Sequence, residues 1–80
     1  MPTGLRKEGY RFFFYPYDLA NEPPHVHVRK GERESKFWLD PVRPARNIGF
    51  RPHDLAVIER LVRDYHDYLR QCWREEKDKQ

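Results

Sequence analysis

The sequence predicts an α+β domain in which a small three-stranded antiparallel sheet packs one face against a long C-terminal helix. Two observations support this fold class. Residues 25–39 alternate between apolar and polar side chains on both sides of a Gly31-Glu32 pair, which is typical of a β-hairpin. Residues 52–73 repeat apolar side chains at spacings of three and four, which is the period of an α-helix.

The length and composition indicate one small domain. The chain has 80 residues, of which 38% are hydrophobic and 15% aromatic, enough to form a compact core. We assign residues 1–80 to a single domain, with the sheet at 9–39, a connector at 40–51, the helix at 52–76 and a frayed tail at 77–80. No apolar run reaches the length of a membrane span, and the single Cys72 cannot form an internal disulfide. We therefore expect a cytoplasmic protein with no membrane segment.

The first strand is expected at residues 10–15, after a basic, polar lead-in at residues 1–8. Its side chains are aromatic on both faces except for Arg11, and Pro16 ends it. Such a strand either is covered on both faces or exposes one aromatic face for binding. Residues 17–24 contain two prolines and read as a loop.

The hairpin has one register that keeps the apolar side chains together. If Lys30 faces Arg33, then Val26 faces Phe37 and both share a side with Val28. The other side then carries six mostly polar or basic side chains: His25, His27, Arg29, Glu34, Lys36 and Trp38.

The connector at 40–51 is broken by Pro41, Pro44 and Gly49, with at most a short extended piece at residues 42–43. Pro52 suits the first position of the following helix. We expect the core to contain Val26, Val28, Phe37, Leu39, Leu55, Ile58, Val62, Tyr65 and Leu69.

The helix is expected to extend beyond the sheet. A helix over residues 52–73 is about 33 Å long, whereas a strand of six residues spans about 20 Å. The apolar surface around residues 69–73 would then need a cover, so we expect a homodimer or a small protein partner.

The polar side of the hairpin carries the candidate chemistry, and we expect its basic and aromatic side chains, the two imidazoles included, to be at least partly exposed on the sheet face away from the helix. His25 and His27 could act as general acid and base and Lys36 as the phosphate-binding cation, which are the groups needed to cleave RNA. Arg11, Tyr15, Arg29 and Trp38 are the side chains that would stack on bases and contact phosphates. RNA is therefore a candidate partner, and the face is either a nuclease site or a nucleic-acid-binding surface.

Two other interpretations remain open for the same residues. The face could dock a protein partner without catalysis, with the imidazoles only capping the sheet. No cofactor or metal is expected, but if a metal binds, His25 and His27 would be its ligands. A third ligand would then come from Asp18, Glu34, Asp40, His53 or His66.

Several segments together resemble a known family. These are Met1-Pro2-Thr3, residues 9–15, the Glu22-Pro23-Pro24-His25-Val26-His27-Val28 motif, residues 36–39 and Pro41-Val42. The chain resembles the small bacterial proteins of domain-of-unknown-function family 4160. The resemblance implies a single-domain prokaryotic protein that is often encoded beside another small protein, in the manner of a toxin–antitoxin pair. It supplies no catalytic mechanism.

Overall fold

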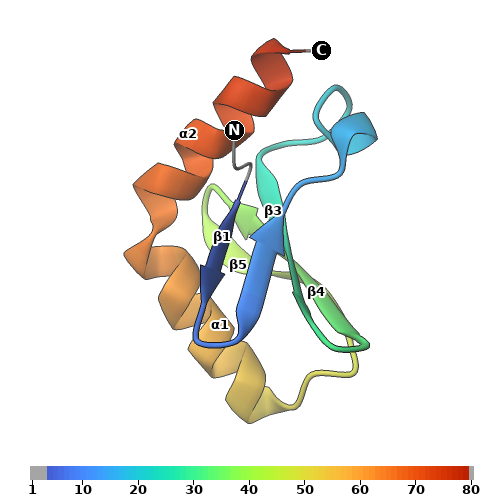
Figure 1. Ribbon diagram of the computed structural model, residues 1–80, viewed down its shortest axis with the longest axis vertical. Coiled ribbons are helices and arrows are strands. Elements are labelled where there is room, and N and C mark those ends of the chain that lie inside the picture. The colour runs from blue at the N-terminus through green and yellow to red at the C-terminus, as the bar shows by residue number, and fades with distance from the viewer. Residues whose placement is uncertain (1–3, 80) are drawn as a thin grey trace.

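Five strands, and not the predicted three, form the antiparallel sheet of this α+β domain (Figure 1). The computed structural model describes residues 4–79. Each strand pairs with its neighbours in the chain, in the order β1-β2-β3-β4-β5. The strands are β1 (Leu5–Lys7), β2 (Tyr10–Phe13), β3 (His25–Lys30), β4 (Arg33–Leu39) and β5 (Val42–Ile48). The three predicted strands are β2, β3 and β4, and the two additional strands form the edges.

Strand β1 lies where the sequence predicted an unstructured lead-in. It pairs with β2 through a two-residue turn in which both Glu8 and Gly9 have positive φ, 51° and 85°. This is the backbone of a tight hairpin turn whose twist matches that of the strands. Part of the predicted lead-in, Met1 to Thr3, lies outside the described residues, as does Gln80 of the predicted tail.

Strand β5 corrects the prediction of a connector at residues 40–51. It pairs with β4 from Leu39↔Val42 to Glu34↔Ile48, with a register shift at Lys36/Phe37 that brings Pro44 opposite Phe37. Proline is tolerated at an edge strand and at an irregularity, because there its missing N–H breaks no ladder bond. Pro44 therefore indicates that β5 is an edge strand, and the strand continues through it.

The predicted register of the central hairpin is confirmed at all six positions of β3. The partners include His25↔Trp38, Val26↔Phe37 and Lys30↔Arg33. Val26, Val28 and Phe37 have no exposed surface and face the helices. The histidines consequently lie on the opposite face of the sheet. We call it the helix-free face because neither α-helix packs across it, although the Trp73 ring of α2 reaches its end and lies 5.0 Å from the His25 ring.

The predicted single helix is divided into α1 (Pro52–Asp64) and α2 (His66–Asp78). At Tyr65 the backbone leaves the helical region, with φ −109° and ψ 24°. Helix α1 contacts β4 and β5, whereas α2 contacts β3. A sheet twists along its width, so a change of direction lets the two segments pack on different parts of it (Figure 1). Helix α2 ends at Asp78 and not at residue 76.

Helix α1 begins at Pro52, as predicted, but without a side-chain cap from Arg51. A guanidinium cannot accept a hydrogen bond. Instead the carboxylate of Asp54 accepts one from the Arg51 backbone N–H at 3.4 Å. Asp54 also accepts a hydrogen bond from the Tyr10 hydroxyl at 3.0 Å, which ties the start of α1 to β2.

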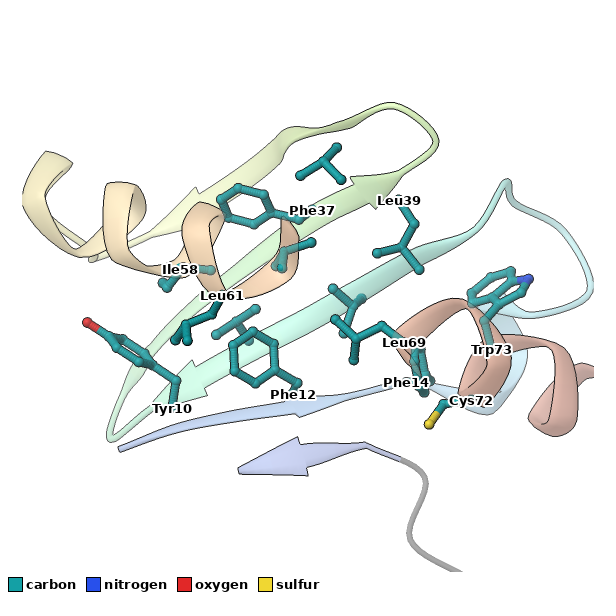
Figure 2. Close-up of a cluster of buried hydrophobic side chains, with 14 of the residues drawn as sticks. Tyr10, Phe12, Phe14, Phe37, Leu39, Ile58, Leu61, Leu69, Cys72 and Trp73 are labelled. Atoms are coloured by element: carbon teal, nitrogen blue, oxygen red, sulfur yellow. The ribbon is translucent and has the colours of Figure 1, made fainter. Parts of the chain in front are cut away.

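The core lies between the sheet and the two helices (Figure 2). All of its predicted members are buried except Leu55 and Tyr65, which are partly buried and packed against it. Leu69, Cys72 and Trp73 of α2 are also buried, and Trp73 meets Phe14 at a ring distance of 6.0 Å. The expectation that residues 69–73 overhang the sheet is therefore wrong, because residues of the same chain cover them. The homodimer was expected only to cover this overhang, so the physical reason for expecting it no longer holds.

Neither helix is long and apolar enough to cross a membrane among the residues that the structure describes.

Candidate functional site

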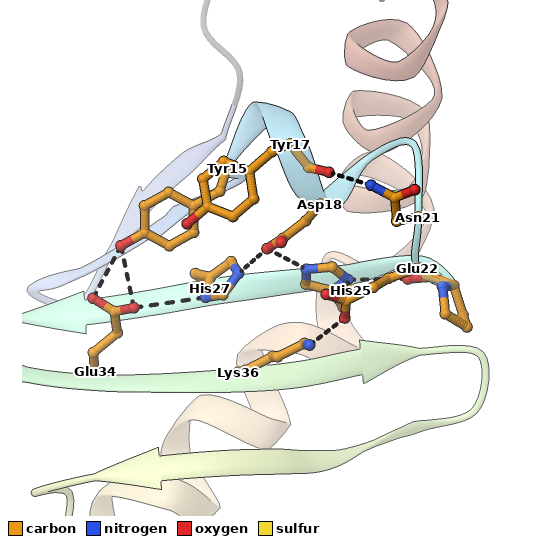
Figure 3. A network of polar contacts seen from close by, with 10 residues as sticks. Tyr15, Tyr17, Asp18, Asn21, Glu22, His25, His27, Glu34 and Lys36 are labelled. Carbon is orange, nitrogen blue, oxygen red and sulfur yellow. Dashed lines mark hydrogen bonds and ion pairs between the residues drawn. The ribbon is translucent and has the colours of Figure 1, made fainter.

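The segment between β2 and β3, residues 14–24, folds back over the helix-free face of the sheet. We call it the covering segment. It contains a short 3-10 helix, η1 (Pro16–Asp18), whose Asp18 points down toward the histidines of β3 (Figure 3). His25 is 0% exposed and His27 is 3% exposed. The expectation that both imidazoles lie at the surface is therefore wrong, because the loop predicted at residues 17–24 covers them.

Asp18, His25 and His27 form one cluster. Oδ2 of Asp18 lies 3.1 Å from Nε2 of His25 and 2.9 Å from Nε2 of His27. The three donor atoms all lie within 4.8 Å of one another. Two histidines at i and i+2 on a strand point to the same face. The 3-10 turn then brings the carboxylate back between them.

The outer nitrogen of each imidazole also faces an oxygen. Nδ1 of His25 donates to the backbone carbonyl of Pro23 at 3.0 Å. Nδ1 of His27 has no hydrogen-bond partner among residues 4–79, and the nearest carboxylate oxygen, Oε2 of Glu34, is 3.6 Å away. The same Glu34 carboxylate accepts hydrogen bonds from the Tyr15 hydroxyl at 3.3 and 3.4 Å.

Burial and hydrogen bonding shift the acidities in this cluster in definite directions. Burial lowers the pKa of His27, against the opposing effect of its hydrogen bond to Asp18. Burial alone would raise the pKa of Asp18, but hydrogen bonds from His27 and His25 outweigh it, so this pKa lies below its usual value. Burial, followed by the Glu34 carboxylate, raises the pKa of Tyr15. Both shifts favour the state in which Asp18 is a carboxylate and His27 is neutral.

A hollow of about 340 Å³ opens beside the cluster. Its lining contains two carboxylates and an imidazole, together with aromatic and cationic side chains: Asp18, Glu22, His27, Tyr15, Tyr17, Lys36, Trp38 and Arg46. Tyr17 is 70% exposed and stacks on Tyr15 at a ring distance of 5.7 Å. The ammonium of Lys36 lies 4.6 Å from the Trp38 ring centroid and forms an ion pair with Glu22.

Three arginines form a row across neighbouring strands on the same face. Arg6 of β1 is the cross-strand partner of Arg11 of β2, and Arg11 is the partner of Arg29 of β3. We call these the arginine row. All three are exposed, and they line a shallow depression together with Lys30. None of the ion pairs within residues 4–79 involves any member of the row.

The structure thus places the predicted site residues in two regions, which are the cluster with its adjoining hollow and the arginine row. His25 and His27 lie in the buried cluster. Lys36 lines the hollow and forms an ion pair with Glu22. Tyr15 and Trp38 line the hollow, and Arg11 and Arg29 are adjacent in the arginine row. The sequence interpretation missed Arg6 because β1 was not predicted. A Gly9 placed just before the aromatic strand was the signal that could have indicated the hairpin.

A comparison with protein-family models adds an assignment to this geometry. The model described as domain of unknown function DUF4160 matches residues 9–74, which include the covering segment, the cluster, all of α1 and most of α2. This chain belongs to the DUF4160 family. Neither the curated proteins nor the solved structures contain a significant match to this DUF4160 domain.

Proposed function

We propose that this DUF4160 protein binds single-stranded RNA on the helix-free face of its sheet, as one component of a toxin–antitoxin-type pair. The observation that carries the binding proposal is the arginine row. Side chains of directly paired residues on neighbouring strands lie about 5 Å apart, and like charges there repel one another. Three adjacent guanidiniums that form no ion pair with any described carboxylate are well placed to bind phosphate groups.

The positive charge of the arginine row is not neutralised, although an acidic side chain lies nearby. Glu34 is the cross-strand partner of Arg29, yet its carboxylate faces Tyr15 and His27. Arg11 places its guanidinium 4.9 Å from the Phe13 ring centroid, a contact that orients the group without using its N–H donors. The row is therefore a preformed cationic strip.

The hollow supplies a second element of RNA recognition. Tyr17 and Trp38 offer aromatic surfaces, and Arg46, which is exposed, adds a further cation. Proteins that bind single strands combine a cationic track for the backbone with aromatic side chains that stack on the bases. An extended strand would place phosphates on the arginine row and a base at the hollow.

Cleavage of the RNA is less well supported than binding. An acid–base pair must reach the 2′-hydroxyl and the leaving oxygen of the substrate. His25 has no exposed surface, and both of its ring nitrogens already contact Pro23 and Asp18. In this arrangement the His25–His27 pair cannot transfer both protons to and from a bound strand.

Fluorescence anisotropy with a labelled single-stranded RNA tests the binding proposal. Affinity should fall steeply with salt, and the double variant Arg11→Gln/Arg29→Gln should reduce the slope of log K against log salt by about 1.4, since each contact to a single strand contributes about 0.7. The matched control is Arg51→Gln/Arg74→Gln, which removes the same charge from two exposed arginines that also have no ion pair within residues 4–79.

Equal losses in both double variants would mean only non-specific charge attraction and would refute the assignment to the arginine row. Intact RNA after long incubation is expected, whereas cleavage that His27→Gln abolishes would establish the nuclease alternative. The toxin–antitoxin part has a separate test, which is co-expression with the product of the adjacent gene. Growth arrest that the neighbour relieves, or copurification of the two chains, is expected. If neither growth arrest nor copurification is observed, the toxin–antitoxin part of the proposal is refuted.

A further inference from the structure

The cluster of Asp18, His25 and His27 is difficult to explain by hydrogen bonds alone. The side chain of His25 is completely buried, and each of its ring nitrogens faces an oxygen: the Pro23 carbonyl at 3.0 Å from Nδ1 and the Asp18 carboxylate at 3.1 Å from Nε2. A carbonyl oxygen only accepts, so Nδ1 must carry a hydrogen. In a neutral ring Nε2 then presents a lone pair to a carboxylate oxygen. A buried imidazolium, a protonated Asp18 carboxyl or a metal cation between the two atoms would each resolve this contact.

No tautomer of a neutral His27 ring satisfies both of its nitrogens either. Its Nε2 lies 2.9 Å from the same Asp18 oxygen, and its buried Nδ1 lacks a hydrogen-bond partner among residues 4–79. If the proton of a neutral ring sits on Nε2, Nδ1 is an unsatisfied buried acceptor, which is costly. If the proton sits on Nδ1 it points toward Glu34 at 3.6 Å, and Nε2 presents a second lone pair to Asp18.

The tautomers that satisfy the outer nitrogens are those of metal-binding histidines. Such histidines bind the ion through one nitrogen and direct the other N–H to a backbone carbonyl or a carboxylate. His25 has the Pro23 carbonyl in this position at 3.0 Å. For His27 the Glu34 carboxylate lies in the same direction, at 3.6 Å from Nδ1, and would have to move closer to accept a hydrogen bond. Glu34 is itself held by the Tyr15 hydroxyl, so the supporting shell is fixed by further contacts.

The spacing of the donors also fits an ion. Nitrogen and oxygen ligands lie about 2.0–2.2 Å from Zn²⁺, so neighbouring ligands of a tetrahedral or octahedral site are roughly 3.0–3.5 Å apart. The two Asp18–imidazole distances, 2.9 and 3.1 Å, are close to this range, and all three donors lie within 4.8 Å of one another. Only small movements are needed to accommodate an ion.

We propose that Asp18, His25 and His27 bind a divalent first-row transition-metal ion at the junction of the covering segment and β3. Two imidazoles and one carboxylate suit Zn²⁺, Fe²⁺, Co²⁺ or Ni²⁺, and they disfavour Mg²⁺ and Ca²⁺, which prefer oxygen ligands. Since Asp18 and His27 border the hollow, the remaining coordination positions face solvent on that side. The ion would clamp the covering segment to the sheet and leave an open position for an exogenous ligand.

The test uses the full chain without a histidine tag, freed of metal by dialysis against chelator, and adds no RNA. Titration with Co²⁺ should give visible absorption bands that saturate at one ion per chain. Zn²⁺ should displace the Co²⁺ and Mg²⁺ should not. The thermal unfolding midpoint should rise with Zn²⁺. Because this readout does not involve RNA, it is independent of the arginine-row experiment.

The variants Asp18→Asn and His27→Gln should each abolish the bands and the thermal shift. Both keep the size of the side chain and some hydrogen bonding, and circular dichroism verifies that they fold. His53→Gln is the matched control, because His53 is an exposed histidine outside the cluster, and it should bind Co²⁺ like the original chain. A folded parent protein that gives no saturable bands refutes the proposal. So does retention of the bands in both cluster variants, or their loss in His53→Gln.

Discussion

Replacing Leu69 by Ala tests whether α2 belongs to the core of a single chain. Leu69 is 0% exposed within the monomer. The substitution removes three carbon atoms, a transfer loss of about 2.4 kcal/mol at about 0.8 kcal/mol per methylene. The residual cavity adds to this, so the free energy of unfolding should fall by about 2.5–5 kcal/mol. A domain of this size has about 4–12 kcal/mol in total, so the variant should be only marginally stable.

Urea unfolding at two protein concentrations measures this loss and separates two explanations. With an m-value of about 1–1.5 kcal/mol/M, a loss of about 3 kcal/mol lowers the midpoint by about 2–3 M. If Leu69 packs within its own chain, the midpoint is the same at both concentrations, whereas a dimer interface makes it concentration-dependent. Gln71→Ala, on the exposed side of α2, should change stability by less than about 0.5 kcal/mol. A concentration-dependent midpoint, or a loss below about 1 kcal/mol for Leu69→Ala, would refute this account of α2.

Three further predictions concern other parts of the domain. Cys72 is buried, and burial raises the pKa of its thiol. A thiol reagent should therefore modify Cys72 at least about 100-fold more slowly in buffer than in urea. Equal rates would show that this side of α2 is not packed against the core. The Tyr10 hydrogen bond lowers the pKa of Asp54, so this carboxylate contributes stability above its unfolded-state pKa that is lost as the pH falls through the lower folded-state pKa. Urea midpoints measured from pH 5 down to pH 2 should therefore fall less steeply for Asp54→Asn than for the parent chain, and parallel curves would contradict the effect. Arg11→Gln should raise the urea midpoint slightly at low salt by relieving repulsion within the arginine row, and the gain should vanish near 1 M salt, where screening is nearly complete; an unchanged gain would rule out charge as its cause.

The parts of the fold that the sequence predicted correctly are those with a clear period. The β3–β4 register follows from strict alternation around Gly31, since a slip by one residue would place valines opposite charges. Strand β1 was missed because three residues are too few to show alternation, and because a Glu at positive φ is an uncommon turn residue. Strand β5 was missed because Pro44 normally argues against a strand, a rule that an edge position relaxes.

The candidate site was only partly predictable for a different reason. Alternation correctly placed His25, His27 and Arg29 on one face, but it says nothing about what covers that face. The covering segment decides this, and its path depends on the tertiary contacts of Tyr15 and Asp18 with the β3 and β4 side chains. Sequence alone offered Asp18 as one of five possible third ligands. The row formed by Arg6 depends on a strand that was not recognised.

Glu34 links the two proposed sites and explains how both can exist on one small face. Its backbone position opposite Arg29 would allow it to neutralise the arginine row. Its carboxylate instead faces Nδ1 of His27 and accepts from Tyr15, contacts that the covering segment and the histidine cluster provide. If an ion binds Nε2 of His27 as proposed, the imidazole proton would lie on Nδ1 and would strengthen the attraction of Glu34 toward the cluster. The same arrangement that would complete a metal site therefore keeps the acid away from Arg29. The Nε of Arg29 donates to the Gly31 carbonyl at 3.2 Å, and its terminal nitrogens would contact the phosphate.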